Sequence, residues 1–473
     1  MRRTKIVCTL GPATDDYAVL KNMIRAGMNV ARLNFSHSTY DEHKRRIDMV
    51  KRARKELDTP IAILLDTKGP EIRIKTFEHD KAVLKKGDKF TLTTRDVVGT
   101  DSCVSITYAE LPRYVKKGSR ILVNDGLIEL TVQSTNATDI VTVVGNDGVL
   151  TNRKSINLPD SDIDMPYLSD VDRADIEFGI AQDVDYIAMS FVRSVDDVRI
   201  VKKLLNEHDA NDIQLIAKIE NRSGVDNVMS ILAECDGVMV ARGDMGVEIP
   251  FEELPGIQKD LISRCYRQGK KVITATQMLE SMINNPRPTR AEISDVANAI
   301  YDGSSAIMLS GETAAGNFPV ESVRTMALVA EQTESNINYK KRFHALDPQI
   351  KSVTDAVSHS TCAAAFDLDA KAIIAVSRTG YTARKVSRFR PSAPIIAATT
   401  SNKAYNQLAM NWGVAPTLSK MQESSDDLFR HAMTCAVNTG LVAEGDLVVI
   451  AAGVPVGVSG NTNTMRIEYI RKQ

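Results

Sequence analysis

The chain has 473 residues, of which 43% are hydrophobic and 25% charged, and its formal net charge at pH 7 is −1. This composition is typical of a globular protein, and the length suits about three domains of ordinary size. A nearly neutral chain offers no global field that would attract nucleic acid or an anionic membrane, so neither is an expected partner.

The cysteines and the N-terminal segment indicate the cellular compartment in which the protein works. The six cysteines are dispersed and form no Cys-x-x-Cys pair, which argues against a zinc site or a disulfide framework and favours a reducing compartment. The apolar run after the basic start ends at Gly11-Pro12, too early for an export signal. No apolar run reaches the roughly 18 residues that a membrane span requires. We therefore expect a cytoplasmic protein.

Short apolar runs alternate with amphipathic helical stretches, the pattern of successive βα units. The runs predicted as strands are Lys5–Leu10, Val30–Phe35, Ile61–Asp66, Tyr186–Phe191, Leu215–Ile219, Gly237–Ala241, Lys271–Ala275 and Ala306–Leu309. This number of units predicts a (β/α)8 barrel, the TIM-barrel fold, over residues 1–68 and 165–336.

One connection in this pattern is abnormally long, between the third run and the helix predicted at Ser169–Gln182. It contains short predicted strands at Phe90–Thr93, Arg120–Val123, Leu127–Val132 and Ile140–Val144, separated by turn signals such as Asn-Asp-Gly. A structureless loop of this length is improbable in a compact protein. We predict an inserted β-barrel lid domain over residues 69–164, leaving the barrel where an active site would lie.

The strand and helix pattern restarts after residue 336. Ala372–Val376, Ile395–Thr399 and Leu447–Ala451 are typical of buried parallel strands between helices. Residues 337–473 are therefore predicted to form a separate, open α/β regulatory domain.

The C-terminal ends of the predicted barrel strands are unusually polar. In barrel enzymes these ends meet on one rim and supply the catalytic groups. The polar ends are Arg32–His37, Asp66–Lys68, Ser190, Lys218–Asn221, Arg242–Asp244, Thr276–Gln277 and Ser310–Glu312. Their convergence predicts an active site on this rim.

Lys218, Glu220 and Asp244 form the strongest candidate group. Lys218 and Glu220 are two apart on one strand and so share a face, and Asp244 arrives from the neighbouring strand. Two carboxylates that leave room for water and phosphate suit Mg²⁺, and the lysine could stabilise a phosphoryl group or an enolate. The alternative is a structural ion-pair network at the barrel rim.

Further polar residues extend this candidate site. Arg32 and Arg73 are possible phosphate clamps, with surface ion pairs as the alternative. An oxygen-rich group suits a large monovalent cation better than a second Mg²⁺, although loop-capping hydrogen bonds explain it equally well. Its members are Asn34, Ser36, Asp66 and Thr67. The sequence does not decide whether His37 contacts a ligand.

Long ordered segments across essentially the whole chain resemble the pyruvate kinase family. They are Thr4–Pro12 (TKIVCTLGP), Asn29–His37 (NVARLNFSH), Leu64–Arg73 (LLDTKGPEIR), Ala217–Asn221 (AKIEN), Met239–Pro250 (MVARGDMGVEIP), Ile273–Ser281 (ITATQMLES), Asn285–Asn298 (NPRPTRAEISDVAN) and Ile307–Thr313 (IMLSGET). The resemblance is to bacterial-type members without an appended phosphohistidine-like domain. It implies transfer of the phosphoryl group of phosphoenolpyruvate to ADP, giving pyruvate and ATP in glycolysis.

The resemblance also implies roles for single residues. Lys218 would stabilise the transferring phosphoryl group and the enolate, with Arg32 and Thr276 as further catalytic residues; Thr276, or water near it, is the candidate proton donor. The substrate would contact Arg32, Gly243, Asp244 and Thr276. Glu220 and Asp244 would hold Mg²⁺ (or Mn²⁺), and Asn34, Ser36, Asp66 and Thr67 would hold K⁺. The nucleotide would contact Asn34, Phe35, Ser36, His37, Arg73 and Lys154.

A hydroxyl-rich loop in the C-terminal domain lies between a predicted strand and a helix. It consists of Ser377, Arg378, Thr379, Gly380, Tyr381 and Thr382. Such a loop can cradle a phosphate, although an ordinary helix cap has the same composition. In similar proteins it binds a sugar-phosphate or nucleotide effector, and the family is usually tetrameric, so we expect an effector and a homotetramer by resemblance only.

Two other functions compete with this interpretation. A Mg²⁺-dependent aldolase or mutase acting on pyruvate-like enolates would share the metal and enolate site, but it would not need the inserted domain, Arg73 or the potassium group. A non-catalytic sugar-phosphate sensor would use only the C-terminal domain, and it would not need the intact Lys218, Glu220, Asp244 and Thr276.

Overall fold

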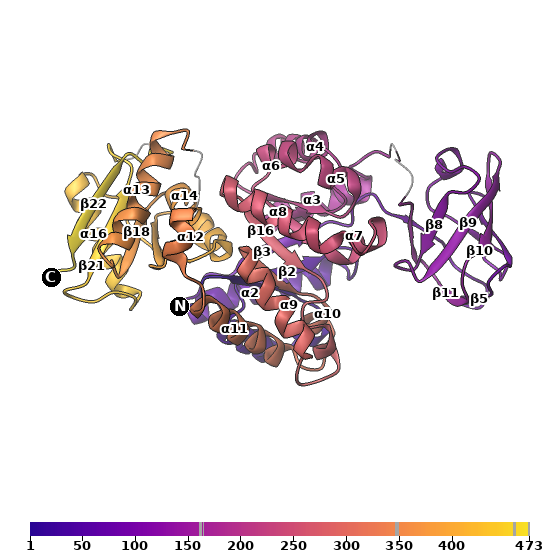
Figure 1. The fold of residues 1–473 in the computed structure, drawn as a ribbon, viewed down its shortest axis with the longest axis horizontal. Coiled ribbons are helices and arrows are strands. Elements are labelled where there is room, and N and C mark those ends of the chain that lie inside the picture. Colours follow the sequence, from indigo (N-terminus) through magenta and orange to yellow (C-terminus); the bar gives the residue numbers. More distant parts are fainter. Residues whose placement is uncertain (160–162, 164, 346–349, 457–459, 472–473) are drawn as a thin grey trace.

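Three bodies follow one another along the long axis of the molecule in the computed structural model (Figure 1). The structure describes residues 1–159, 163, 165–345, 350–456 and 460–471. A barrel occupies the middle, a small β domain lies at one end and an α/β domain at the other (Figure 1). The expected end of the inserted domain, at residue 164, falls outside the described residues.

The central body is a closed barrel of eight parallel strands with the order β1-β17-β16-β15-β14-β13-β3-β2. The strands are β1 (Lys5–Thr9), β2 (Val30–Asn34), β3 (Ala62–Asp66), β13 (Tyr186–Met189), β14 (Gln214–Ile219), β15 (Gly237–Ala241), β16 (Lys271–Ala275) and β17 (Ala306–Leu309). Each coincides with one predicted run to within two residues, and the predicted TIM barrel is confirmed.

Helices surround the barrel. They are α1 (Tyr17–Ala26), α2 (Tyr40–Leu57), α3 (Asp170–Ala181), α4 (Val195–Glu207), α5 (Arg222–Asp226), α6 (Val228–Glu234), α7 (Arg242–Glu248), α8 (Leu254–Gln268), α9 (Arg290–Asp302), α10 (Gly311–Ala314) and α11 (Pro319–Ser335), with 3-10 turns η1 (Pro12–Thr14) and η3 (Glu280–Ile283). Capping boxes start α2 at Thr39 and α9 at Thr289. Gly269 ends α8 in the left-handed conformation, where glycine has no steric penalty.

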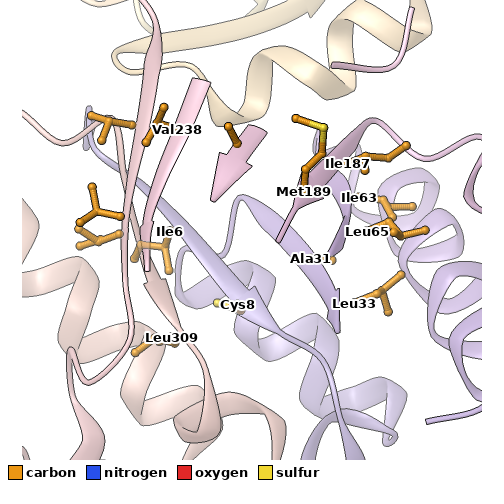
Figure 2. Close-up of a cluster of buried hydrophobic side chains, with 14 of the residues drawn as sticks. Ile6, Cys8, Ala31, Leu33, Ile63, Leu65, Ile187, Met189, Val238 and Leu309 are labelled. Atoms are coloured by element: carbon orange, nitrogen blue, oxygen red, sulfur yellow. The ribbon is translucent and has the colours of Figure 1, made fainter. Parts of the chain in front are cut away.

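The barrel strands are buried on both faces, which is why their sequences are continuous apolar runs. Their outward side chains, such as Ile6, Leu33 and Leu65, pack against the helices (Figure 2). Their inward side chains fill the barrel, and Ala409 and Met410 of the C-terminal domain belong to this inner cluster. The C-terminal domain therefore inserts a short segment into the barrel core.

The inserted domain contains a seven-stranded sheet with the order β4-β12-β8-β9-β10-β6-β7 and a two-stranded sheet β11-β5. The elements are β4 (Ile72–Arg73), β5 (Lys81–Leu84), β6 (Lys89–Thr93), β7 (Cys103–Ser105), η2 (Leu111–Arg113), β8 (Arg120–Val123), β9 (Ile128–Thr135), β10 (Asp139–Val144), β11 (Gly148–Thr151) and β12 (Ser155–Asn157). A bridge between Ile74 and Ile106 joins the two edges of the larger sheet. This closure gives the domain its barrel-like form around a core of its own.

The C-terminal domain is a five-stranded sheet with the order β20-β19-β18-β21-β22, flanked by helices. Its elements are α12 (Tyr339–Ala345), α13 (Val353–Asp367), β18 (Ala372–Val376), α14 (Tyr381–Ser387), β19 (Ile395–Thr399), α15 (Asn402–Gln407), η4 (Leu408–Met410), β20 (Val414–Leu418), α16 (Ser425–Asn438), β21 (Leu447–Ala452) and β22 (Thr464–Tyr469). The predicted strands are confirmed as β18, β19 and β21. Sequence analysis missed β20 and the antiparallel edge strand β22.

A membrane-spanning helix was not expected from the sequence. Among the described residues, none of the helices combines the length and the apolar character that crossing a bilayer requires.

Candidate active site

Lys218 occupies the centre of the polar rim. Its side chain leaves the end of β14 and is 11% exposed, and its Nζ lies 3.1 Å from Asp66 Oδ1 and 3.0 Å from Glu220 Oε1. Nζ also donates a hydrogen bond of 2.7 Å to Ser190 Oγ. Burial alone would lower the pKa of Lys218, but the carboxylates of Asp66, Glu220 and Asp244 outweigh burial and raise it. The lysine is therefore a fixed positive charge at neutral pH.

Glu220 is fully buried beside this lysine. Its Oε2 accepts a hydrogen bond of 2.6 Å from the Phe191 amide, whereas its Oε1 has no hydrogen-bond partner. Burial raises the pKa of Glu220 although Lys218 opposes this, and the Asp244 carboxylate adds to the rise. One oxygen of this buried carboxylate forms an ion pair with Lys218 but no hydrogen bond, and a second carboxylate lies nearby, so the site can accommodate a further cation.

The donor set suits a hard divalent cation. In the part of the chain that the structure describes, no three His, Cys, Asp or Glu side chains gather closely enough to form a complete protein cage for a metal. Mg²⁺ usually takes one or two protein carboxylates and completes its shell with water and substrate phosphate. Glu220 and Asp244 fit this pattern.

Arg32 and Asp66 form a buried pair next to Lys218. Arg32 Nε lies 2.6 Å from Asp66 Oδ2, and Arg32 Nη1 donates to Thr9 Oγ1 at 2.9 Å. Burial alone would raise the pKa of the Asp66 carboxyl, but Arg32 and Lys218 hold it below its usual value. Asp66 lies opposite Asn34 in the register of β2 and β3, so part of the oxygen-rich group predicted from the sequence does come together.

A cavity of about 420 Å³ opens above this rim, between the barrel and the inserted domain. Of the predicted site residues it is lined by Arg32, Asn34, Ser36, His37, Arg73, Lys154, Lys218 and Asp244. Arg73 already pairs with Glu71 at 2.7 Å. The hydrogen bond of 2.8 Å from Asn157 Nδ2 to Glu248 Oε1 joins the inserted domain to the barrel.

Phe35 does not line this cavity among the described residues. Its ring stacks on His43 with a centroid distance of 4.0 Å and packs near Tyr40 and Phe178. Any contact between Phe35 and a nucleotide would therefore involve its backbone rather than its ring.

Gly243 and Thr276 meet at the adjacent strand ends. A Cβ at Gly243 would lie 2.9 Å from Thr276 Cγ2, so only glycine fits there without displacement. Thr276 and Gln277 have φ values of 74° and 55°, a strained conformation for residues other than glycine. Arg242 holds the turn by donating to Thr276 O at 2.5 Å.

The hydroxyl-rich loop of the C-terminal domain lines a separate cavity of about 80 Å³. Ser377, Arg378, Thr379 and Thr382 contribute to this lining, and Lys420 adds a positive charge. Gly380 has φ 75° and precedes α14. Thr382 Oγ1 lies 2.8 Å from Thr462 Oγ1, which ties the loop to the segment before β22.

Comparison with known proteins agrees with this geometry. The family model described as "Pyruvate kinase, barrel domain" matches residues 1–323, and the one described as "Pyruvate kinase, alpha/beta domain" matches residues 355–468. The chain belongs to the pyruvate kinase family.

Relatives of known structure and sequence extend the match to nearly the whole chain. A pyruvate kinase of Clostridium acetobutylicum is 47% identical over 472 residues, covering 99% of this chain and 100% of that protein. One of Bacillus licheniformis is 49% identical over 473 residues, covering 99% of this chain and 81% of that protein. The crystal structure of a pyruvate kinase from Cryptosporidium parvum superposes with a TM-score of 0.94 at 39% identity, covering 99% of this chain and 96% of that one.

Membership of the pyruvate kinase family decides between the functions left open by the sequence. The chain is an enzyme, a phosphotransferase that moves the phosphoryl group of phosphoenolpyruvate to ADP in a family that uses Mg²⁺ and K⁺. An aldolase, a mutase or a non-catalytic sensor is not favoured.

Sequence reasoning missed several residues that line the main cavity. They include Asp125, Ser155, Asn157, Phe191, Arg193, Ser223 and Glu248, with the apolar Ile163 and Met165. Glu248 lies inside a segment that carried the pyruvate kinase resemblance, which was an available signal. Phe191 and Ser223 carry no such signal, because only the fold brings them to the cavity.

Proposed function

We propose that Lys218, Glu220 and Asp244 are the centre of phosphoryl transfer from phosphoenolpyruvate to ADP. The observation that carries this proposal is the buried Lys218 ammonium held 3.0 Å from Glu220 Oε1, an oxygen that has no hydrogen-bond partner. A fixed positive charge at this point stabilises negative charge that develops on the transferring phosphoryl group and on the enolate oxygen.

Glu220 and Asp244 would hold Mg²⁺ or Mn²⁺. When bound, the ion supplies positive charge to the phosphate and carboxylate oxygens of the substrate. The free Oε1 of Glu220 and the mutual repulsion of the two carboxylates support this assignment. Lys218 contributes charge without occupying a coordination position.

Substrate positioning is assigned to Arg32, Gly243, Asp244 and Thr276. Arg32 would bind the phosphate of phosphoenolpyruvate, since its guanidinium reaches the cavity while Asp66 and Thr9 fix its orientation. Gly243 and Thr276 would receive the carboxylate end, because a Cβ at Gly243 would lie 2.9 Å from Thr276 Cγ2 and 3.7 Å from its hydroxyl, and the glycine leaves this space open. Thr276, or water ordered beside it, would protonate the enolate.

The monovalent cation is assigned to the oxygens of Asn34, Ser36, Asp66 and Thr67. Asn34 Oδ1 accepts the Ser36 amide at 3.2 Å, which keeps the first two residues of the group together. A singly charged K⁺ suits a group with one carboxylate, and its charge would add to that of Lys218 near the phosphoryl group.

The nucleotide is assigned to Asn34, Phe35, Ser36, His37, Arg73 and Lys154. Arg73 and Lys154 come from the inserted domain and face the same cavity as His37. Two cations at this wall would bind the phosphates of ADP. The inserted domain would then act as a lid that brings these charges over the barrel rim.

Regulation is assigned to the loop Ser377, Arg378, Thr379, Gly380, Tyr381 and Thr382, which would bind a sugar phosphate or a nucleotide. Arg378 and Lys420 supply the positive charge that a phosphate needs. The resemblance implies help from a later loop, about Ala452–Thr464, of which residues 457–459 lie outside the described residues. Titration of fructose bisphosphate, AMP and sugar monophosphates at subsaturating phosphoenolpyruvate would identify the effector.

A homotetramer in the cytoplasm is the proposed working form. The edge strand β22 exposes Met465, Ile467 and Tyr469 to solvent by 37%, 42% and 61%. An open strand edge with apolar side chains favours pairing with a second copy. The described cysteines are all free thiols, in keeping with a reducing compartment.

The three proposed domains are residues 1–68 with 165–336, 69–164 and 337–473, and a separate apolar core in each supports this division.

One assay tests the function directly: pyruvate formation from phosphoenolpyruvate with and without ADP, Mg²⁺ and K⁺. We expect turnover only when ADP and the divalent ion are both present, and strong stimulation by K⁺. A folded sample that releases no pyruvate in the presence of ADP would refute the proposal.

A further inference from the structure

Ser190 stands at the end of β13, between the proposed potassium group and the proposed magnesium carboxylates. It is 2% exposed. The sequence placed it among the polar strand ends, and neither the sequence nor the family resemblance gave it a specific role, yet its hydroxyl is the nearest acceptor to Lys218, with Nζ to Oγ at 2.7 Å.

The hydroxyl of Ser190 has two acceptors within reach, Thr67 O at 2.6 Å and Asp66 Oδ1 at 3.3 Å. The shorter contact directs its proton to Thr67 O, and in either case an oxygen lone pair is left for the Lys218 ammonium. The Ser190 amide donates in turn to Thr67 Oγ1 at 3.2 Å. Ser190 is thus bound through both backbone and side chain to the residue that follows Asp66.

The next residue extends this arrangement to Glu220. Phe191 has φ 54°, a rare conformation for a bulky aromatic residue, which persists only where the surroundings enforce it. In this conformation its amide donates to Glu220 Oε2 at 2.6 Å.

Neighbouring residues enforce the strained turn. Tyr167 donates its hydroxyl proton to Ser190 O at 3.0 Å. Gly69 packs so closely that a Cβ there would lie 2.8 Å from Ser190 Cβ and 3.2 Å from Phe191 Cδ2. The turn is therefore clamped from two sides.

A neutral acceptor suits this place better than a third carboxylate. An ammonium has three N–H bonds; Lys218 Nζ donates a hydrogen bond to Ser190 and lies within ion-pair distance of Asp66 and Glu220. The hydroxyl fixes the position of Nζ without neutralising its charge. Without the hydroxyl, Nζ would be drawn toward the carboxylates and away from the cavity, where it has to act on the substrate.

We propose that Ser190 is a positioning residue for Lys218, and that the Ser190–Phe191 turn sets the geometry between the potassium group and the magnesium carboxylates. This inference rests on the proposed function, because it assumes the role of Lys218 in phosphoryl transfer.

A double-mutant cycle tests it. Ser190→Ala is made in the natural chain and in a Lys218→Met chain, and kcat and the KM for phosphoenolpyruvate are measured at saturating Mg²⁺, K⁺ and ADP. Misplacement of a catalytic group by about 1 Å can lower the rate about a hundredfold. We expect Ser190→Ala to lower kcat about 30- to 100-fold, to leave KM within about threefold, and to cause no further loss in the Lys218→Met chain, because the two changes remove the same interaction.

Two measurements separate positioning from folding. Mn²⁺ affinity, read by electron paramagnetic resonance, is expected to stay within about twofold in Ser190→Ala, because neither carboxylate is changed. Ser194→Ala is the matched control on the same connection: Ser194 caps α4 and does not contact Lys218. It should lower the melting temperature while leaving kcat unchanged.

Distinct results would overturn the inference. The first is a kcat of Ser190→Ala within threefold of that of the natural chain. The second is a loss of kcat on adding Ser190→Ala to the Lys218→Met chain that equals the loss in the natural chain, because Ser190 would then have a general structural role. If Ser190→Ala does not fold, Ser190→Cys decides: a weak acceptor of similar size should give an intermediate kcat, and an unchanged kcat would refute the role. Failure of the proposed function itself has another signature, a near-normal kcat in Lys218→Met.

Discussion

Lys218 Nζ and Glu220 Oε1 lie 3.0 Å apart at the end of β14, where the glutamate is fully buried and the lysine reaches the cavity. The lysine keeps its proton because it is surrounded by carboxylates, whereas the glutamate has one oxygen without a hydrogen-bond donor. The two residues therefore have separate roles: Lys218 supplies positive charge to the substrate, and Glu220 supplies a ligand to the metal ion.

Removing the lysine charge tests the role of Lys218. Lys218→Met should lower kcat by about a thousandfold or more, as expected for loss of electrostatic transition-state stabilisation. The fold and Mn²⁺ binding should persist, because methionine fills a similar volume and touches neither metal oxygen. Steady-state kinetics and Mn²⁺ resonance titration measure the two effects. A near-normal kcat would refute the assigned role.

Removing the carboxylate charge of Glu220 tests its role as a metal ligand. Glu220→Gln should raise the dissociation constant of Mn²⁺ about 10-fold or more, since one of two anionic ligands is lost. The exposed Glu253, paired with Arg222 at 2.6 Å, provides the control substitution Glu253→Gln. Equal Mn²⁺ affinities in the two variants would exclude Glu220 as a ligand.

Exchange of the monovalent cation tests the oxygen-rich group. Activity in Na⁺ or Tris salts should fall well below activity in K⁺ at the same ionic strength, because a smaller or bulkier cation fits the group of Asn34, Ser36, Asp66 and Thr67 less well. Initial rates at fixed Mg²⁺ provide the measurement. Equal rates in all three salts would remove the potassium assignment.

Two buried lysines at the opposite mouth of the barrel predict a pH dependence of stability. Lys5 Nζ donates to Val414 O at 2.8 Å and Lys271 Nζ to Gln214 Oε1 at 2.7 Å. Burial lowers the pKa of each to about 7. In the unfolded chain a lysine pKa is about 10.4, so between these values the unfolded state binds more protons and stability rises with pH. Below pH 7 both states are protonated and this dependence vanishes.

Lys271→Met should weaken that dependence. The slope of the unfolding free energy between pH 7.5 and 9 should fall by up to about 1.4 kcal/mol per pH unit, the value for one proton. Urea unfolding at three pH values measures it, with the exposed Lys44→Met as control. A slope equal to that of the natural chain would contradict the prediction.

The segment inserted into the barrel mouth predicts coupling between two domains. Met410 is fully buried among the inner barrel side chains, and Tyr186 donates its hydroxyl proton to Gln407 O at 2.6 Å. Met410→Ala should leave a cavity and destabilise the protein by about 2–5 kcal/mol. Thermal unfolding should then start with the C-terminal domain, whereas Met421→Ala, at a residue that is 60% exposed, should have little effect.

The sequence by itself determined the barrel strands, because a parallel strand buried on both faces must be a continuous apolar run. It also determined the polar rim: residues such as Lys218 and Glu220 follow or end such runs, and parallel strand ends meet on one side of a barrel. The residue types then limited the chemistry to hard cations and phosphate, and the family resemblance supplied the substrates.

Only the tertiary structure decided which of these groups contact one another. Asp66 contacts both Arg32 and Lys218, the Phe35 ring turns away into an aromatic stack, and the edges of the inserted sheet close between Ile74 and Ile106. The edge strand β22 escaped prediction because its half-exposed side chains give a weak pattern. Ser190 was placed on the polar rim by the sequence but received no role there, since a single hydroxyl acquires its role only from the lysine that another strand places 2.7 Å away. Such contacts depend on register and on close packing between segments distant in sequence, which local periodicity does not encode.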